Sequence, residues 1–176
     1  IAVPLAALIG TTAGLIAGYS GGRLDTFIMF FTEMIQSLPG IMFMVIIIFI
    51  FRSLLPPTWG SGMITLILGF ALVSWVNLAR LIRINLLQIK SQLFVEAAIS
   101  IGASPRRVIM HHILPNLQHV ILVWVINAIP AIILLEAVLG YIGVGVTEAT
   151  GGDEFTAVSW GGMFFSGRSA LTRNPL

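Results

Sequence analysis

Long apolar runs separated by short polar segments are the main feature of this chain. Charged residues are absent from four of these runs, at 1–22, 34–51, 53–79 and 120–135. Each run is long enough, or nearly so, to cross a hydrocarbon core about 30 Å thick. The runs are continuous rather than alternating, which indicates helices and not the strands of a membrane barrel. We therefore predict four membrane spans, at residues 1–19, 26–51, 62–81 and 119–139.

Composition narrows the class of protein further. Of the 176 residues, 57% are hydrophobic and 9% are charged, whereas soluble domains carry about a quarter charged residues. Disordered chains are poor in apolar residues and rich in charge, so disorder does not explain the pattern. The sequence predicts an all-α, polytopic membrane protein with no room for a separate soluble catalytic domain. The absence of cysteine excludes disulfides and thiolate chemistry.

Two of the predicted spans carry further signals. The second contains Pro39, which should kink it, and broken membrane helices often flank a substrate path, although an ordinary packing kink is an alternative. Pro56 and Pro57 separate the second span from the third. Small residues recur at every fourth position of the first span, which predicts tight packing against a neighbouring helix, with a pore-lining role as the alternative. They are Ala2, Ala6, Gly10, Gly14, Gly18 and Gly22.

The distribution of basic residues predicts the topology. One side of the four-span arrangement holds Arg23, Arg80, Arg83, Lys90, Arg106 and Arg107. The other side holds Arg52, Arg168 and Arg173. Because cytoplasmic loops are enriched in Lys and Arg, we expect 82–118 to be cytoplasmic and 140–176 to be extracytoplasmic. The basic residues are thus explained by topology, and no nucleic-acid partner is inferred.

The segment between the third and fourth spans predicts two short helices joined by a hinge. Gly102 can end the first helix in the left-handed conformation, Ser104 is a good N-cap, and Pro105 then occupies the first helical position. Pro115 is expected to end the second helix before the fourth span. An apolar face on the first helix indicates either a helix lying on the membrane surface or a docking surface for a soluble partner. Its residues are Leu93, Phe94, Ala97, Ala98 and Ile101.

A family resemblance bears on this choice. The run Glu96-Ala97-Ala98, followed by Gly102 and by Leu114-Pro115, resembles the EAA loop of binding-protein-dependent ABC importer permeases. The sequence His-Ile-Leu-Pro-Asn at 112–116 is similar to the peptide and nickel branch of that family. Further matches in order and spacing make the chain most similar to the second permease subunit of dipeptide, oligopeptide or nickel systems. They lie at 18–22 with Asp25, 37–39, 136–137, 143–146 and 159–163.

The resemblance implies an architecture. Residues 1–176 would form one type I ABC importer transmembrane domain, as a fragment of a permease that usually has a further span at each end. The stretch 147–158 departs from the family by being longer than a short Pro-rich connection. The partners implied are a homologous permease subunit, two cytoplasmic ATPases, an external solute-binding protein and the lipid bilayer of the plasma (inner) membrane.

The resemblance also implies a mechanism. The loop would couple ATP hydrolysis in the partner subunits to transport of peptides or nickel, with Gly102 shaping the turn and Glu96 capping or pairing locally. ATP and Mg²⁺ would bind to the ATPases, because the only lysine, Lys90, follows Ile89 and so cannot belong to a phosphate loop. The chain itself is then neither an enzyme nor the holder of a cofactor. An ATP-independent secondary transporter or channel is the rival hypothesis, and a purely structural membrane anchor or assembly protein is a third. The expected coupling residues are Glu96, Ala97, Ala98, Gly102, Ala103, Ser104, Leu114 and Pro115.

Three residues within the spans are candidates for the translocation path, namely Pro39, Asn127 and Glu136. A carboxylate at the bilayer centre costs roughly 2.5–3.5 kcal/mol on insertion scales, and such residues are usually functional. An interfacial or packing position for Glu136 is the alternative. Adjacent histidines point about 100° apart on a helix, so no metal site is expected at His111, His112 and His119.

Overall fold

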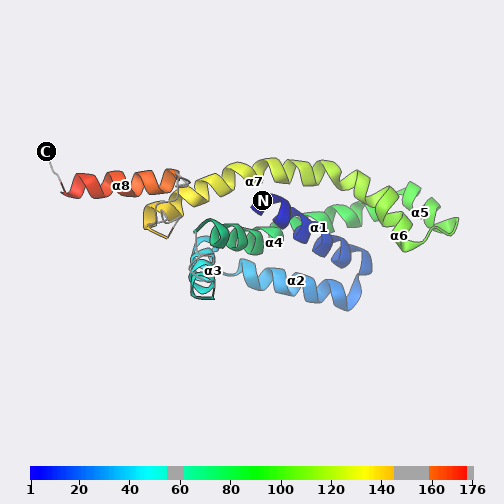
Figure 1. Cartoon of the computed structure of the whole chain (residues 1–176). Helices are drawn as coiled ribbons and strands as arrows, with labels where there is room; N and C mark the ends of the chain where they lie inside the picture. The colour runs from blue at the N-terminus through cyan, green and yellow to red at the C-terminus, as the bar shows by residue number, and fades with distance from the viewer. Residues whose placement is uncertain (55–61, 145–158, 174–176) are drawn as a thin grey trace. The chain divides into compact units, whose positions relative to one another are not determined.

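The computed structural model describes residues 1–54, 62–144 and 159–173, and all regular elements within these ranges are helices (Figure 1). The predicted all-α class is therefore confirmed. The predicted break at Pro56-Pro57 and the divergent stretch 147–158 lie outside the described residues. The helices are α1 (Ala2–Ser20), α2 (Gly22–Gln36), α3 (Gly40–Leu54), α4 (Gly62–Lys90), α5 (Leu93–Ser100), α6 (Pro105–Val108), the π-helical turn η1 (Ile109–Ile113), α7 (Leu114–Ile142) and α8 (Trp160–Arg173).

The number of possible spans agrees with the prediction, but the second span has a different form. Three described helical segments are long and apolar enough to cross a membrane, at Ala2–Ser20, Ile64–Lys90 and Pro105–Ile142. Helices α2 and α3 add a fourth only if this bent pair counts as one span. The predicted interruption at Pro39 is confirmed as a break and not as an ordinary kink, because residues 37–39 are not helical and the two helices are bent by 93°. Pro39 has no N–H to donate and disfavours helical geometry at Leu38, so the helix ends here.

The helices at the third and fourth predicted spans extend beyond the residues predicted to cross the membrane. Helix α4 continues past residue 81 to Lys90, and α7 begins at Leu114 in direct continuation of η1. Pro115 therefore does not end a helix. The N–H of Leu114 donates to the carbonyl of Ile109, five residues earlier. This wide π turn shifts the hydrogen bonding out of α register immediately before Pro115, and the helix passes through the proline.

Two compact units divide the chain. The α3 unit comprises Ile1–Ala2, Leu38–Val73 and Ala128–Leu176. Within it, Met44 and Ile48 of α3 are buried, and the Arg52 guanidinium donates a 3.0 Å hydrogen bond to the carbonyl of Val144. Helices α7 and α8 meet at two glycines, since a Cβ added to Gly140 would lie 2.5 Å from Gly161 Cα.

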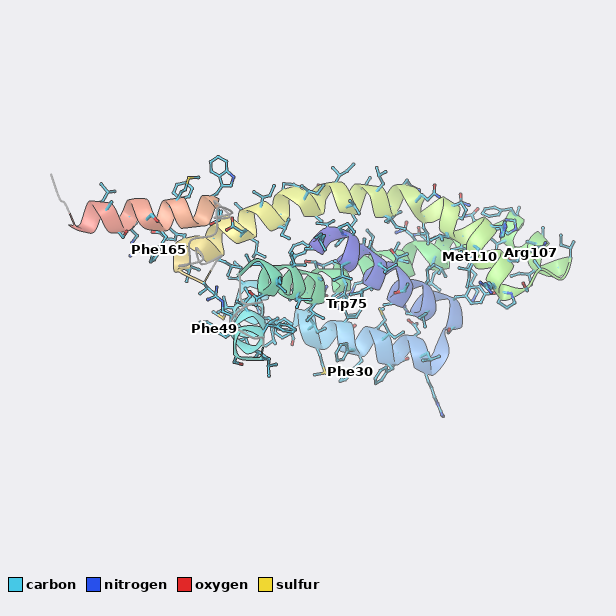
Figure 2. The ribbon with its side chains drawn as sticks, viewed as in Figure 1. Phe30, Phe49, Trp75, Arg107, Met110 and Phe165 are labelled. Atoms are coloured by element: carbon cyan, nitrogen blue, oxygen red, sulfur yellow. The ribbon has the colours of Figure 1, made fainter. Side chains whose placement is uncertain are left out.

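The α1 unit comprises Val3–Ser37 and Ser74–Asn127, and its tightest packing joins α1 to α4. A Cβ added to Gly10 would lie 2.7 Å from the carbonyl oxygen of Trp75. A Cβ added to Gly14 would lie 2.5 Å from the carbonyl oxygen of Ala79. Real side chains essentially never approach so closely, so only glycine permits this contact between backbones. The predicted role of the small residues in helix packing is confirmed here; Trp75, which packs beside them, is labelled in Figure 2.

This contact predicts that one methyl group will destabilise the fold. Gly14→Ala should reduce the free energy of unfolding by about 1–3 kcal/mol, because α1 and α4 must separate to admit the Cβ. The matched control is Gly167→Ala on α8, where an added Cβ meets nothing within 4 Å. The control should be neutral or stabilising by up to about 1 kcal/mol. Thermal unfolding in detergent measures both variants, and equal midpoints for the two would contradict the packing argument.

Candidate functional site

The turn between α5 and α6 has the geometry that the sequence predicts. Gly102 adopts a φ of 86°, in the left-handed region. Its N–H donates to the carbonyl of Ile99 at 2.9 Å, and the N–H of Ala103 donates to the carbonyl of Ala98 at 3.0 Å. This pair of bonds is a Schellman motif, which satisfies the last carbonyls of α5. Ser104 occupies the N-cap position of α6 with Pro105 in the first turn, although the Ser104 side chain makes no capping hydrogen bond.

The buried side of α5 differs from the predicted apolar face. Val95 and Ala98 are buried, and of the five residues predicted to share one face only Ala98 belongs to this side. The other four are exposed, with Leu93 at 83% and Ile101 at 88%. Helix α5 thus has one apolar side that packs within the α1 unit and another that has no cover among the described residues.

An apolar cluster attaches the buried side of α5 to the longer helices. It joins α5 to α4, α6, η1 and α7, and Tyr19 of α1 and Ala103 pack against it. Arg107 and Met110, labelled in Figure 2, mark the exposed surface of α6 and η1 beside it. Because its core members are at most 9% exposed, a displacement of α5 would open voids in the cluster. The members are Leu78, Ile82, Leu86, Val95, Val108, Ile113, Leu117 and Val120.

The remaining predicted coupling residues lie around this cluster. Glu96 and Ala97 are exposed on α5, while Leu114 is half-buried and Pro115 exposed at the start of α7. The backbone carbonyl of Glu96 accepts a 2.9 Å hydrogen bond from the Ser100 hydroxyl. The expected local cap or pair of the Glu96 carboxylate is not found in the part of the chain that the structure describes.

The three candidates for a translocation path show local contacts. The carbonyl of Pro39 accepts a hydrogen bond from the N–H of Phe43 at 3.0 Å. The Asn127 side-chain amide donates to the carbonyl of Val123, one turn earlier on α7, at 2.8 Å. Glu136 is half-buried, and its Oε1 is buried without a hydrogen-bond partner among the described residues. These contacts do not test a path, so the role of the three residues stays a prediction.

No candidate metal site emerges from the histidines. Within 1–54, 62–144 and 159–173 there is no group of three or more His, Cys, Asp or Glu side chains placed to hold a metal ion. The ring of His112 instead lies near that of Phe94, with a centroid separation of 6.3 Å. This contact adds a further link between α5 and η1.

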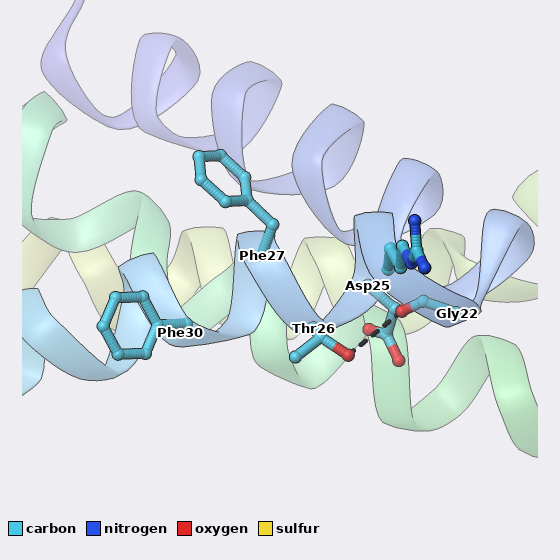
Figure 3. A pocket seen from close by; sticks show the side chains of 6 residues that line it. Gly22, Asp25, Thr26, Phe27 and Phe30 are labelled. Atoms are coloured by element: carbon cyan, nitrogen blue, oxygen red, sulfur yellow. Dashed lines mark hydrogen bonds between the residues drawn. The ribbon is translucent and has the colours of Figure 1, made fainter.

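An ion pair that was not predicted from the sequence joins α2 to α4. Arg83 Nε lies 2.5 Å from Asp25 Oδ1, and Arg83 Nη2 lies 2.6 Å from Asp25 Oδ2. Asp25 borders an open pocket of about 680 Å³ (Figure 3), whose lining includes Arg23, Phe27 and Phe30. The sequence feature that could have indicated this pair is Asp25 itself. A carboxylate at the start of a largely apolar segment is costly unless a basic side chain pairs with it.

Comparison with known proteins identifies the family. Residues 10–171 match the family model described as "Binding-protein-dependent transport system inner membrane component". The chain is 31% identical to the oligopeptide transport system permease protein OppC of Haemophilus influenzae, over 95% of this chain and 49% of that protein. It is 33% identical to OppC of Bacillus subtilis, over 96% and 50%, and 32% identical to the dipeptide permease DppC of B. subtilis, over 89% and 44%.

The chain therefore belongs to the family of inner membrane components of binding-protein-dependent transport systems. The resemblance seen in the sequence is confirmed, as is the all-α class typical of type I ABC importer membrane domains. The chain is a multi-pass protein of the plasma (inner) membrane. It spans about half the length of the curated relatives that it matches.

The α5–α6 turn predicts a graded response to substitution at Gly102. Gly102→Ala should cost about 1–2 kcal/mol, because a Cβ disfavours the left-handed conformation. Gly102→Asn should cost less, since asparagine tolerates that conformation. Hydrogen exchange at the Gly102 and Ala103 amides measures local opening, which should increase in the order Gly, Asn, Ala. Equal protection in all three proteins would show that the turn does not require a positive φ.

Proposed function

We propose that the chain is a transmembrane permease subunit of an ATP-driven importer of dipeptides or oligopeptides. Family membership supports the transport role, and the names of the relatives OppC and DppC favour peptides over nickel. The subunit lines the translocation path together with a homologous permease. A solute-binding protein delivers the substrate from outside, and two cytoplasmic ATPases supply the energy. On this proposal residues 1–176 belong to a single transmembrane domain.

The exposed side of α5 is the observation that carries the coupling role. Leu93, Phe94 and Ile101 are exposed on or next to a helix whose other side is firmly packed. Fully burying a side chain such as Leu or Ile contributes about 1.5–3 kcal/mol, so such a surface favours a partner that covers it. With residues 82–118 in the cytoplasm and 140–176 outside, that partner is a cytoplasmic ATPase with an apolar groove.

The attachment of α5 indicates how docking would act on the membrane helices. Closure of the two ATPases on binding ATP moves the docked helix. Val95 passes that motion to α4 and α7, because the packed cluster moves as a body. The spans then switch between inward-facing and outward-facing arrangements. The chain needs no catalytic residue or cofactor for this role, since ATP and Mg²⁺ bind to the partner subunits.

Glu136 is the strongest of the three path candidates. Its buried carboxylate oxygen lacks a hydrogen-bond partner among the described residues. Burying a polar atom without a partner is costly, and ionisable residues in membrane spans are usually functional. We assign Glu136 to the vicinity of the translocation path, with Asn127 and Pro39 as further candidates for its lining.

Co-purification tests the coupling role. Ile101→Asp should abolish recovery of a soluble ATPase with the full-length permease in mild detergent, because it places a charge in an apolar contact. The fold itself should tolerate the change, since Ile101 is 88% exposed. Gly102→Pro should act in the same way, since proline cannot adopt the φ of 86°. Gln118→Glu, an exposed change on α7, is the control for added negative charge. Recovery of no ATPase with the natural protein would favour the ATP-independent transporter.

Transport by the assembled system in proteoliposomes tests the substrate. Labelled dipeptide should be taken up in the presence of ATP and the solute-binding protein, and nickel should not. ATP-dependent uptake of nickel alone would retain the importer and correct its substrate class. Uptake that does not require ATP would contradict the proposal.

A further inference from the structure

The ion pair between Asp25 and Arg83 has the geometry of a strong, directional link. Two N–H groups of the guanidinium face the two carboxylate oxygens at 2.5 and 2.6 Å. The Asp25 side chain is 17% exposed and the Arg83 side chain is 29% exposed. Bidentate pairs of this kind fix orientation as well as distance. The start of α2 is therefore held to α4 in one defined arrangement.

Apart from this ion pair, the apolar packing of α2 on α4 lies near its other end, where Ile35 packs against Trp75, Val76 and Ala79. Thr32 is its buried residue, while Leu24, Phe27 and Met34 are about half or more exposed; Phe30, labelled in Figures 2 and 3, is 60% exposed. Near its other end, the Gln36 amide donates a 2.5 Å hydrogen bond to Asn77 Oδ1 on α4. One end of α2 is thus held to α4 by both packing and a hydrogen bond, whereas the link at its start is the Asp25–Arg83 ion pair.

The stretch of α4 that holds Asp25 also holds α1 and α5. Gly18 of α1 approaches Arg83 so closely that an added Cβ would lie 3.4 Å from its backbone. Lys90 donates a 3.2 Å hydrogen bond to the carbonyl of Tyr19, and its Nζ lies 5.0 Å from the centre of the Tyr19 ring. Leu86 lies in the apolar cluster with Val95 of α5. Residues 83–90 of α4 therefore contact both the end of α1 and the cluster that contains α5.

We propose that Asp25 and Arg83 form a positioning link that makes α2 follow the movement of α5 during transport. A displacement of α5 carries α4 with it through the packed cluster. Helix α2 shares few buried contacts with that cluster, so the bidentate pair transmits the displacement instead. Without the pair, the docked ATPase still hydrolyses ATP, but α2 no longer follows the movement of α4 and α5. This inference rests on the proposed function.

A double-mutant cycle in the complete transporter tests the link. Asp25→Asn, Arg83→Gln and the double variant are reconstituted with the partner subunits, and uptake per ATP hydrolysed is measured along with the amount of assembled complex. Each single variant should lower uptake per ATP about tenfold, and the double variant should lower it no further, because the residues act as one unit. The controls are Glu33→Gln on α2 and Arg80→Gln on α4, which remove the same charges nearby and should leave the ratio within about twofold of the natural protein.

Three results would overturn the inference while leaving the proposed function intact. The first is a normal ratio of uptake to ATP hydrolysis in both single variants. The second is a double variant whose defect equals the product of the single defects, which shows independent action. The third is a loss of assembled complex that fully accounts for the lost uptake, which shows a merely structural role. Absence of ATP-dependent uptake by the natural protein would instead overturn the proposed function, and this inference with it.

Discussion

The direct contact between the backbones of α1 and α4 is the constraint on which the α1 unit depends. In hydrocarbon, apolar side chains gain little by leaving lipid for each other, so association depends on close packing. Gly10 and Gly14 remove the side chains that would keep the helices apart. The same approach continues at Gly18, opposite Arg83 and Leu86. This contact fixes the orientation of α4 relative to α1. It therefore also fixes where the side chains on the other faces of α4 lie.

Two different kinds of contact then attach the remaining elements to α4. Helix α5 is attached by burial, since Val95 packs in a cluster with Ile82 and Leu86. Helix α2 is attached by polar contacts at Arg83 and Asn77, with the packing of Ile35 against Trp75 as its apolar contact with α4. Burial resists any displacement that opens a void, whereas a hydrogen-bonded pair resists chiefly changes in its own geometry. The packing of α5 therefore resists any displacement from α4, whereas the ion pair of α2 resists mainly a change in the distance and orientation of its two side chains.

Features of this fold that depend on local geometry could be predicted from the sequence, and those that depend on distant partners could not. Gly102 and Ser104-Pro105 were assigned correctly, because a left-handed turn and a helix start are specified within a few residues. Pro39 and Pro115 show the limit. One lies at a break between helices, whereas the other lies in a helix because a π turn precedes it. Residue propensity does not distinguish these outcomes, and nothing local pairs Asp25 with a residue 58 positions away.

Under the proposed function, the contrast between α5 and α2 suits a protein whose helices must move without coming apart. A tightly packed cluster transmits force because its members cannot shift separately. A helix such as α2, with Thr32 as its buried residue, can change its surroundings without leaving a large cavity. Such freedom is useful only if the position of the helix is still defined. Directional pairs at its two ends supply that definition at little cost in buried surface, which explains why charged and amide groups occur at these positions in a largely apolar chain.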